Sequence, residues 1–159
     1  MDAVVAVYSD WGIGGAGTQP VVIPEDRKKF ARLTRGCAVI VGRKTLEDFP
    51  GGKPLPGRVN IVLTRQDIVM PGAVIVHTPE EALAEGRKHE RVFIIGGERV
   101  FHEMFPHINR VYVTKIEATP HSDAFFPDLD EAEDWRCVDC GQPLKSGGTE
   151  YRFLIYERI

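Results

Sequence analysis

The carboxylate of Asp26 is the first candidate for chemistry in this sequence, because its neighbours predict that it faces inward. Phe30 and Leu33 follow it at i+4 and i+7, so the three side chains share one face of a predicted helix. Burying an unpaired charge is costly, so a carboxylate on such a face usually has a specific partner, which can be a ligand. An acidic residue in a first helical turn can also simply complement the helix dipole, and the helix alone leaves that interpretation open.

A second candidate is the glycine pair Gly96-Gly97, which follows an apolar run and precedes a predicted helix. Ligands of open α/β sheets bind at the carboxyl ends of the strands. Glycines let backbone amides approach a ligand closely, and a helix start favours a diphosphate. A tight turn without a ligand explains the pair equally well, and the G-x-G-x-x-G dinucleotide fingerprint is absent.

The third candidate is the basic segment Gly42-Arg43-Lys44-Thr45. Its two cations stand at a predicted helix start, where the dipole disfavours positive charge, and this indicates that they face an anion. Arg65 follows a later strand and adds a third positive group. Three basic groups beside a diphosphate site favour an extra phosphate, and hence NADP over NAD. A solvated turn is the alternative, since exposed Lys and Arg are common.

Alternating strands and helices must position these groups. The pattern predicts strands at 3–7, 37–41, 59–64, 73–76, 91–95, 110–116, 135–140 and 151–157, and helices at 24–34, 42–49, 79–89 and 98–105. Such alternation implies parallel crossovers and a sheet covered on both faces. The last two strands follow each other without a helix, which makes the sheet mixed. The Gly-rich segment 9–22 reads as a long loop, a kind that is usually functional.

Composition limits the function further. The 159 residues predict one domain, and a net charge of −3 gives no general attraction to nucleic acid or anionic membranes. No apolar run approaches the roughly 18 residues of a membrane span, and no secretory signal is evident. Three cysteines argue against a disulfide framework. Cys137 and Cys140 make half of a zinc site without a second half, so we expect ordinary thiols and no metal. The acidic stretch 128–134 is expected to be a solvated loop.

Taken together, these residues resemble the dihydrofolate reductase family over nearly the whole chain. The order and spacing of the matching segments are more specific than any one of them. The segments are Val4 to Val7, Gly12-Ile13-Gly14, Pro24-Glu25-Asp26 with Phe30 and Thr34, Val41 to Thr45, Pro54 to Arg58 with Asn60 to Leu63, Ile94 to Gly97, Val111 to Thr114 and Phe126-Pro127.

The resemblance implies NADPH-dependent reduction of 7,8-dihydrofolate to 5,6,7,8-tetrahydrofolate in one-carbon metabolism, with hydride added to pterin C6 and a proton to N5. It implies a three-layer α/β fold over residues 1–159, in which about four helices flank a central eight-stranded mixed sheet. We expect the protein to be a cytoplasmic monomer and a target of antifolates. Its partners are expected to be small molecules, without nucleic acid or membrane.

The resemblance also assigns roles. Asp26 would bind the 2-amino group and N3 side of the pterin as the catalytic residue, Phe30 would pack on the p-aminobenzoyl group, and Arg58 would bind the glutamate α-carboxylate. A carboxylate bound at N3 lies too far from N5 for direct transfer, so the proton would arrive through water. The other expected substrate contacts are Val5, Ala6, Phe49, Leu55, Ile95 and Thr114.

For the cofactor, the resemblance assigns the diphosphate turn to Gly96 and Gly97. Segment 9–22 would be the lid over the nicotinamide. Phosphates of the adenosine half would contact Arg43, Lys44, Thr45, Thr64 and Arg65. The remaining expected contacts are Ala6, Ile13, Gly14, Gly15, Gly42, Leu63, Ile95, Glu98, Arg99, Val100 and Phe101.

One departure from the family pattern concerns the pocket edge. Val21 follows Pro20 where the family usually has tryptophan, a residue that touches the pocket and helps to order a water near the pterin. We expect an altered rate or inhibitor affinity rather than lost activity. If Val21→Trp changed neither turnover nor pterin binding, this position would not belong to the site. Arg27 is more polar than usual, and Phe101 stands where tyrosine is common.

Two other functions remain open from the sequence. A riboflavin-pathway reductase of the same fold also uses NADPH, but it reduces a ribosyl sugar and needs no acid at Asp26. The missing tryptophan slightly favours this enzyme, whereas Asp26, Phe30 and Arg58 together favour folate. A nucleotide- or pterin-binding module without turnover is the third hypothesis. Loss of NADPH absorbance on adding dihydrofolate separates the three.

Overall fold

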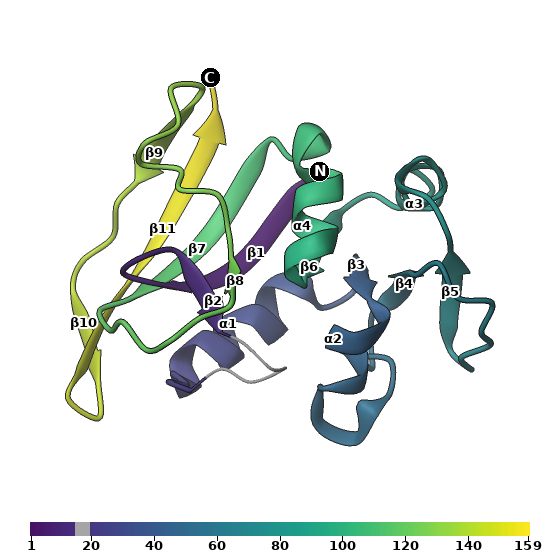
Figure 1. Cartoon of the computed structure of the whole chain (residues 1–159), viewed down its shortest axis with the longest axis horizontal. Coiled ribbons are helices and arrows are strands. Elements are labelled where there is room, and N and C mark those ends of the chain that lie inside the picture. The colour runs from purple at the N-terminus through teal and green to yellow at the C-terminus, as the bar shows by residue number, and fades with distance from the viewer. Residues whose placement is uncertain (15–19) are drawn as a thin grey trace.

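The computed structural model describes residues 1–14 and 20–159 and is built around one large mixed sheet (Figure 1). The strands of that sheet are β1 (Asp2–Tyr8), β3 (Ala38–Gly42), β4 (Val59–Leu63), β5 (Ala73–Val76), β6 (Val92–Gly96), β7 (Arg110–Ile116), β9 (Trp135–Asp139), β10 (Leu144–Ser146) and β11 (Thr149–Arg158). Their order is β10-β11-β7-β1-β6-β3-β4-β5, with β9 also paired to β11.

The nine strands occupy eight positions across the sheet, as the family resemblance implied. Strand β10 pairs with β11 at Thr149 to Tyr151 and β9 pairs with it at Ile155 to Arg158. Because β7 covers the opposite edge of β11, β9 and β10 share one position one after the other (Figure 1). The pairs among β1, β3, β4, β5, β6 and β7 are parallel, and β11 is antiparallel to its neighbours.

Helices cover both faces of the sheet. They are α1 (Pro24–Thr34), α2 (Arg43–Glu47), α3 (Pro79–Gly86) and α4 (Glu98–Met104), with 3-10 turns at Pro50–Gly52 and Phe105–His107. One apolar core joins α3 and α4 to the sheet through Ala82, Val100 and Met104. A second core joins α1 and α2 to the other face through Phe30 and Leu46. The result is the expected three-layer α/β arrangement.

The predicted elements recur with shifts of a residue or a few at their ends. Helix α1 has the predicted bounds, because Pro24 begins it and Gly36, at φ +75°, follows its last turn. Helix α3 begins at Pro79, where the Thr78 hydroxyl accepts a hydrogen bond from the Glu81 N–H at 3.1 Å. It ends at Gly86 rather than at the predicted residue 89. Among the described residues, no helix has both the length and the apolar character that a bilayer crossing needs.

Three short strands were not predicted. Segment 9–22, expected to be a loop, contains β2 (Gly12–Gly14), which pairs with β8 (Ala124–Phe125) far along the chain. Strand β10 forms a hairpin with β11 through Gly147 and Gly148, both at positive φ. That glycine pair was a usable turn signal. The strands themselves have only two or three residues, too few for a periodic pattern.

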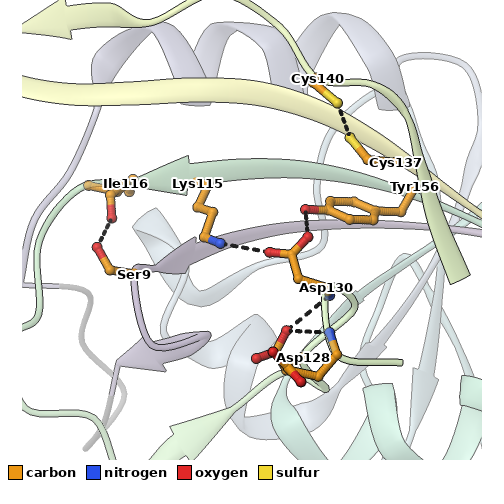
Figure 2. Close-up of polar contacts among 9 residues, drawn as sticks. Ser9, Lys115, Ile116, Asp128, Asp130, Cys137, Cys140 and Tyr156 are labelled. Atoms are coloured by element: carbon orange, nitrogen blue, oxygen red, sulfur yellow. Dashed lines mark hydrogen bonds and ion pairs between the residues drawn. The ribbon is translucent and has the colours of Figure 1, made fainter. Parts of the chain in front are cut away.

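The acidic stretch 128–134 is not simply solvated, which corrects the expectation. Asp130 accepts a hydrogen bond from the Tyr156 hydroxyl at 2.7 Å and forms an ion pair with Lys115 at 3.0 Å (Figure 2). The Asp128 carboxylate accepts hydrogen bonds from the backbone N–H groups of Asp130 and Glu131. The contacts of Asp130 tie the stretch to β7 and β11, and those of Asp128 order the turn itself.

Candidate active site

Asp26 lies in a pocket between α1 and the sheet, as its spacing predicted. The Thr114 hydroxyl, on β7, donates a hydrogen bond to Asp26 Oδ1 at 2.5 Å. The pocket is lined by Val4, Asp26, Lys29, Phe30, Leu33, Tyr112, Val113, Thr114 and Phe153. Its enclosed volume is about 10 Å³, room for one water molecule, so a larger ligand must lie across the open side of the pocket.

The electrostatics of this pocket leave Asp26 less acidic than usual. Burial is the main cause and raises the pKa of Asp26, while the Thr114 hydrogen bond and the charges of Lys29 and Arg27 oppose the rise. Burial also lowers the pKa of Lys29, whose ammonium lies 3.9 Å from the centre of the Phe153 ring. Lys29 was not among the predicted site residues. Its i+3 spacing from Asp26 could have indicated that it shares the inward face.

The predicted apolar contacts gather beside this pocket. Phe30 packs in the same apolar cluster as Phe49, Leu55 and Ile95. Val5 and Ala6, the two predicted contacts on β1, point to opposite faces of the sheet, because side chains alternate along a strand. Val5 points into the core on the other face, so only its backbone can reach this side. Ala6 belongs to a small third cluster that also contains Phe153.

Arg58 lies near the C-terminal end of α1 and is held by three hydrogen bonds. Its Nε donates to Thr34 Oγ1 at 3.1 Å, Nη1 to the Pro56 carbonyl at 2.7 Å, and Nη2 to the Ala31 carbonyl at 3.2 Å. Burial is the main cause that lowers the pKa of Arg58. The hydrogen bonds to Pro56 and Ala31 use one N–H of Nη1 and one of Nη2. The second N–H of each nitrogen remains, and these two can bind a carboxylate side by side.

Asn60 fixes the segment that carries Arg58, a role the sequence reasoning missed. Its side chain is 1% exposed. The Oδ1 atom accepts from the Leu55 N–H at 2.9 Å, and Nδ2 donates to the carbonyls of Leu55 at 3.0 Å and Arg58 at 3.2 Å. A buried amide that satisfies three backbone groups holds this Pro-rich turn in one conformation.

A second, larger hollow lies at the carboxyl ends of β3, β4 and β6. It has a volume of about 560 Å³, within the range of small-molecule sites. Eleven of the predicted cofactor residues line it: Gly42, Arg43, Lys44, Thr45, Leu63, Thr64, Arg65, Gly97, Glu98, Arg99 and Val100. The sequence reasoning missed His77, Thr78, Pro79, Glu80 and Glu103, because the wall they form comes from α3 and the far side of α4.

The cations of this groove differ in their partners. Arg43 forms an ion pair with Glu47 at 2.8 Å, so the anion that it faces belongs to its own helix. Arg99 is likewise paired with Glu103 at 2.9 Å. Lys44 and Arg65 form no ion pair within residues 1–14 and 20–159, which leaves both charges available to an anionic ligand.

Glycines keep the two walls of the groove close together. A Cβ on Gly97 would lie 2.8 Å from Thr45 Oγ1, and one on Gly42 would lie 3.2 Å from Val100 Cγ2. The Gly96-Gly97 peptide bond is cis, and Gly96 has φ +115°, a conformation that favours glycine. No side chain therefore separates the backbone of this turn from its neighbours.

The other predicted cofactor residues that the structure describes do not line the groove. Ile13 and Gly14 are in β2, where the Gly14 N–H donates to Ser122 Oγ at 3.2 Å. Phe101 is 3% exposed and packs edge-on against Phe126 beneath the glycine turn. Ala6, Ile95 and Gly96 do not line the groove either. Gly15, and with it the middle of the predicted lid, lies outside the described residues.

Val21, at the position of the family's tryptophan, is held by its backbone. The Tyr8 hydroxyl accepts from the Val21 N–H at 3.1 Å and donates to its carbonyl at 3.3 Å. Tyr8 has no exposed surface and stands at the end of β1. A buried side chain thus fixes the chain just before α1 and Asp26.

Comparisons with known proteins point to one family. A family model described as dihydrofolate reductase matches residues 1–158. The dihydrofolate reductase of Bacillus subtilis (strain 168) is 36% identical over 149 residues, covering 92% of this chain and 87% of that protein. The dihydrofolate reductase of Neisseria gonorrhoeae is 38% identical over 155 residues, covering 96% and 94%. The solved structure of dihydrofolate reductase from Enterococcus faecalis complexed with NADP(H) and RAB-propyl has a TM-score of 0.87 and 34% identity, covering 99% of this chain and 95% of that one.

Proposed function

This chain belongs to the dihydrofolate reductase family, and we propose that Asp26 is the residue that binds the pterin of 7,8-dihydrofolate in its active site. The protein is an NADPH-dependent oxidoreductase that reduces dihydrofolate to tetrahydrofolate. The observation that carries the assignment of Asp26 is its carboxylate on the inner face of α1, bound by Thr114 in an otherwise largely apolar pocket.

The Asp26 carboxylate accepts hydrogen bonds from the 2-amino group and N3 side of the pterin. Thr114 donates to one of its two oxygens and so orients the group before the substrate arrives. The low-dielectric surroundings strengthen these contacts and favour a protonated ring beside the negative charge. A carboxylate in this position is too far from N5 to protonate it, so the proton reaches N5 through water.

Arg58 binds the α-carboxylate of the glutamate tail. Its free N–H groups, one on each terminal nitrogen, support this assignment. Phe30, Phe49, Leu55 and Ile95 surround the part of the substrate that lies between the two charged ends.

The larger groove suits NADPH, which supplies the hydride when bound. Its volume of about 560 Å³ and the glycine contacts at Gly42 and Gly97 fit a phosphorylated nucleotide. So do the cations Lys44 and Arg65, which have no ion-pair partner among the residues that the structure describes. Gly97 and its neighbours admit the diphosphate, while Lys44, Thr64 and Arg65 bind the phosphate on the adenosine ribose. Ile13 and Gly14 would contact the nicotinamide half, and the contact expected of Gly15 falls outside the described residues.

The remaining parts of the proposal concern the whole protein. Residues 1–159 act as one domain and as a monomer, and the enzyme works in the cytoplasm on small molecules. The net charge of −3, which gives no general attraction to nucleic acid or anionic membranes, supports the restriction to small molecules.

The substitution Asp26→Asn tests the proposal. It keeps the size of the side chain but removes the charge, and we expect kcat/KM for dihydrofolate to fall by about 10²–10⁴-fold at pH 7. The measurement is the loss of NADPH absorbance, with NADPH binding followed separately by fluorescence and expected to be unchanged. Glu25→Gln is the matched control, because Glu25 is an exposed acid in the same helical turn, and it should stay within about twofold. An Asp26→Asn enzyme as fast as the parent would show that the assignment of Asp26 is wrong.

A further inference from the structure

Cys137 and Cys140, which the proposed reaction does not use, lie together at the end of β9. In a regular strand, residues i and i+3 point to opposite faces and lie about 10 Å apart along the chain. Here the pairing with β11 is interrupted by a bulge: Tyr156 pairs with Cys137 and Ile155 with Asp139, so Val138 is the extra residue. The bulge reverses the alternation and brings both thiols to one side of the strand.

The two sulfur atoms are in direct contact. The Cys140 thiol donates to Cys137 Sγ with a separation of 2.9 Å, and Figure 2 shows the two side chains directed at each other. Cys137 also donates to the Asp139 carbonyl at 3.4 Å. A disulfide requires sulfurs about 2.05 Å apart, so closing the bond needs a movement of only about 1 Å.

The surroundings give the two thiols different access. Cys140 is exposed and follows the last residue of β9, whereas Cys137 is partly buried and packs against the main core. Burial and the neighbouring Cys140 raise the pKa of Cys137 to about 12, so this thiol stays protonated near neutral pH. Cys140 is therefore the thiol that a reagent in solution meets first. Cys37 stands before β3 and packs in the other apolar core.

The segment around the pair can accommodate the small movement. Within the described part of the chain, β9 pairs only with β11, so its other edge carries no backbone ladder. Gly141, at φ +59°, follows Cys140 and begins the connection to β10. A bulged edge strand followed by a glycine turn adjusts more easily than a central strand.

We propose that Cys137 and Cys140 form a reversible dithiol–disulfide site, oxidised by low-molecular-weight disulfides. The Cys140 thiolate attacks one sulfur of the reagent R–S–S–R, forming Cys140–S–S–R and releasing RS⁻. Cys137 then gives its proton to the released thiolate, and its sulfur attacks Cys140 Sγ. The Cys137–Cys140 disulfide forms and the second RS⁻ leaves and takes a proton from water. In total, two protein thiols are oxidised and one small disulfide is reduced to two thiols.

Oxidised glutathione is the probe for this site, applied to the intact protein at neutral pH. We expect the number of free thiols to fall from three to one. The intact mass should decrease by about 2 Da, peptide mapping should find Cys137 linked to Cys140, and a dithiol should reverse the change. A chain that keeps three free thiols, or that links Cys37 to either partner, would overturn the proposal.

Single variants separate the two steps. Cys137→Ser leaves Cys140 without its resolving partner, so we expect a stable glutathione adduct on Cys140. Cys140→Ser removes the exposed entry thiol, and we expect at least a tenfold slower reaction at Cys137. Both thiols lie outside the proposed machinery, so the dihydrofolate reductase activity of Cys140→Ser reports whether that variant is folded. Separate glutathione adducts on Cys137 and Cys140 of the parent protein, without a bond between them, would contradict the pairing even if Cys137→Ser fails to fold.

Discussion

Among single residues, Asp26 combines its proposed role in pterin binding with a cost in stability. Burial raises the pKa of Asp26 more than Thr114, Lys29 and Arg27 lower it. The folded state therefore holds the Asp26 proton more tightly than the unfolded chain does. Stability is lost as the pH rises through the folded pKa, and the ionised protein at neutral pH carries the penalty. Active sites often retain such unfavourable groups because binding requires them.

The first prediction follows from the raised pKa of Asp26, which makes its charge destabilising at neutral pH. Asp26→Asn removes the charge but not the hydrogen-bonding oxygen, so it should raise the melting temperature by a few degrees at pH 7. Below the ordinary carboxyl pKa, where the parent residue is also neutral, the difference should vanish. Thermal unfolding from pH 3 to pH 8 measures the melting temperatures of parent and variant. The control Glu25→Gln should show no comparable rise in melting temperature at pH 7. A variant less stable than the parent at pH 7 would mean that the Asp26 charge stabilises the fold.

At the scale of elements, the entry into α1 depends on a contact from β1. Ile23, the residue before α1, provides no side-chain cap, and Pro24 fixes only the first turn. The Tyr8 hydroxyl compensates by bonding both backbone groups of Val21. The direction in which α1 leaves the sheet, and hence the position of Asp26, depends on this anchor.

The second prediction concerns that anchor. Tyr8→Phe leaves the buried ring in place but removes the hydroxyl, and we expect the free energy of unfolding to fall by about 1–2 kcal/mol. Amide exchange of the Val21 N–H should become faster, because its acceptor is lost. Tyr112→Phe is the control, since that hydroxyl makes one long contact, 3.4 Å from Arg110. Unchanged exchange at Val21 would show that the hydroxyl does not hold this segment.

The effect of Val21 on the rate and on inhibitor affinity stays a prediction. Its side chain packs beside Tyr8 and Ile23 rather than in the cluster around Phe30. Val21→Trp should therefore add apolar surface near the start of α1 and change the rate or the affinity for an antifolate. Steady-state kinetics and inhibitor titration measure both effects.

For the molecule as a whole, Arg158 connects the end of β11 to two other parts of the chain. It stands at the end of β11, where Nη2 donates to the carbonyls of Phe105 at 2.7 Å and Ile108 at 2.9 Å. Its Nη1 bonds Asp134 at 3.2 Å, and its guanidinium lies 4.6 Å from the centre of the Trp135 ring. One side chain thus joins the last strand to β9 and to the turn after α4, three parts of the chain that are far apart in sequence.

The third prediction tests whether these contacts of Arg158 stabilise the fold. Arg158→Met keeps much of the apolar stem but leaves the carbonyls of Phe105 and Ile108 without this donor, so we expect a loss of about 2–4 kcal/mol in the free energy of unfolding. Urea unfolding measures it. Arg136→Met, on the exposed side of β9, should change stability by less than about 0.5 kcal/mol. Equal effects of the two substitutions would contradict a special role for Arg158.

Local patterns in the sequence were enough to predict the layers of the fold and the candidate acid. Apolar runs defined β1, β3, β4 and β6, and the i+4 and i+7 spacing put Asp26 and Phe30 on the inner face of α1. These are local patterns, because the period of a helix or a buried strand is set by residues a few positions apart. The resemblance to known enzymes added roles that no local pattern contains.

The contacts between distant parts of the chain could not be predicted from local patterns and are known from the folded structure alone. Thr114 bonds Asp26 across 88 positions of sequence, Lys29 reaches the Phe153 ring of β11, and β2 pairs with β8. The bulge at Val138 likewise arises from pairing with β11, and it turns two cysteines of opposite expected faces toward each other. Such contacts depend on how strands align across the sheet, and the local sequence specifies a side chain's face but not its partner on another element.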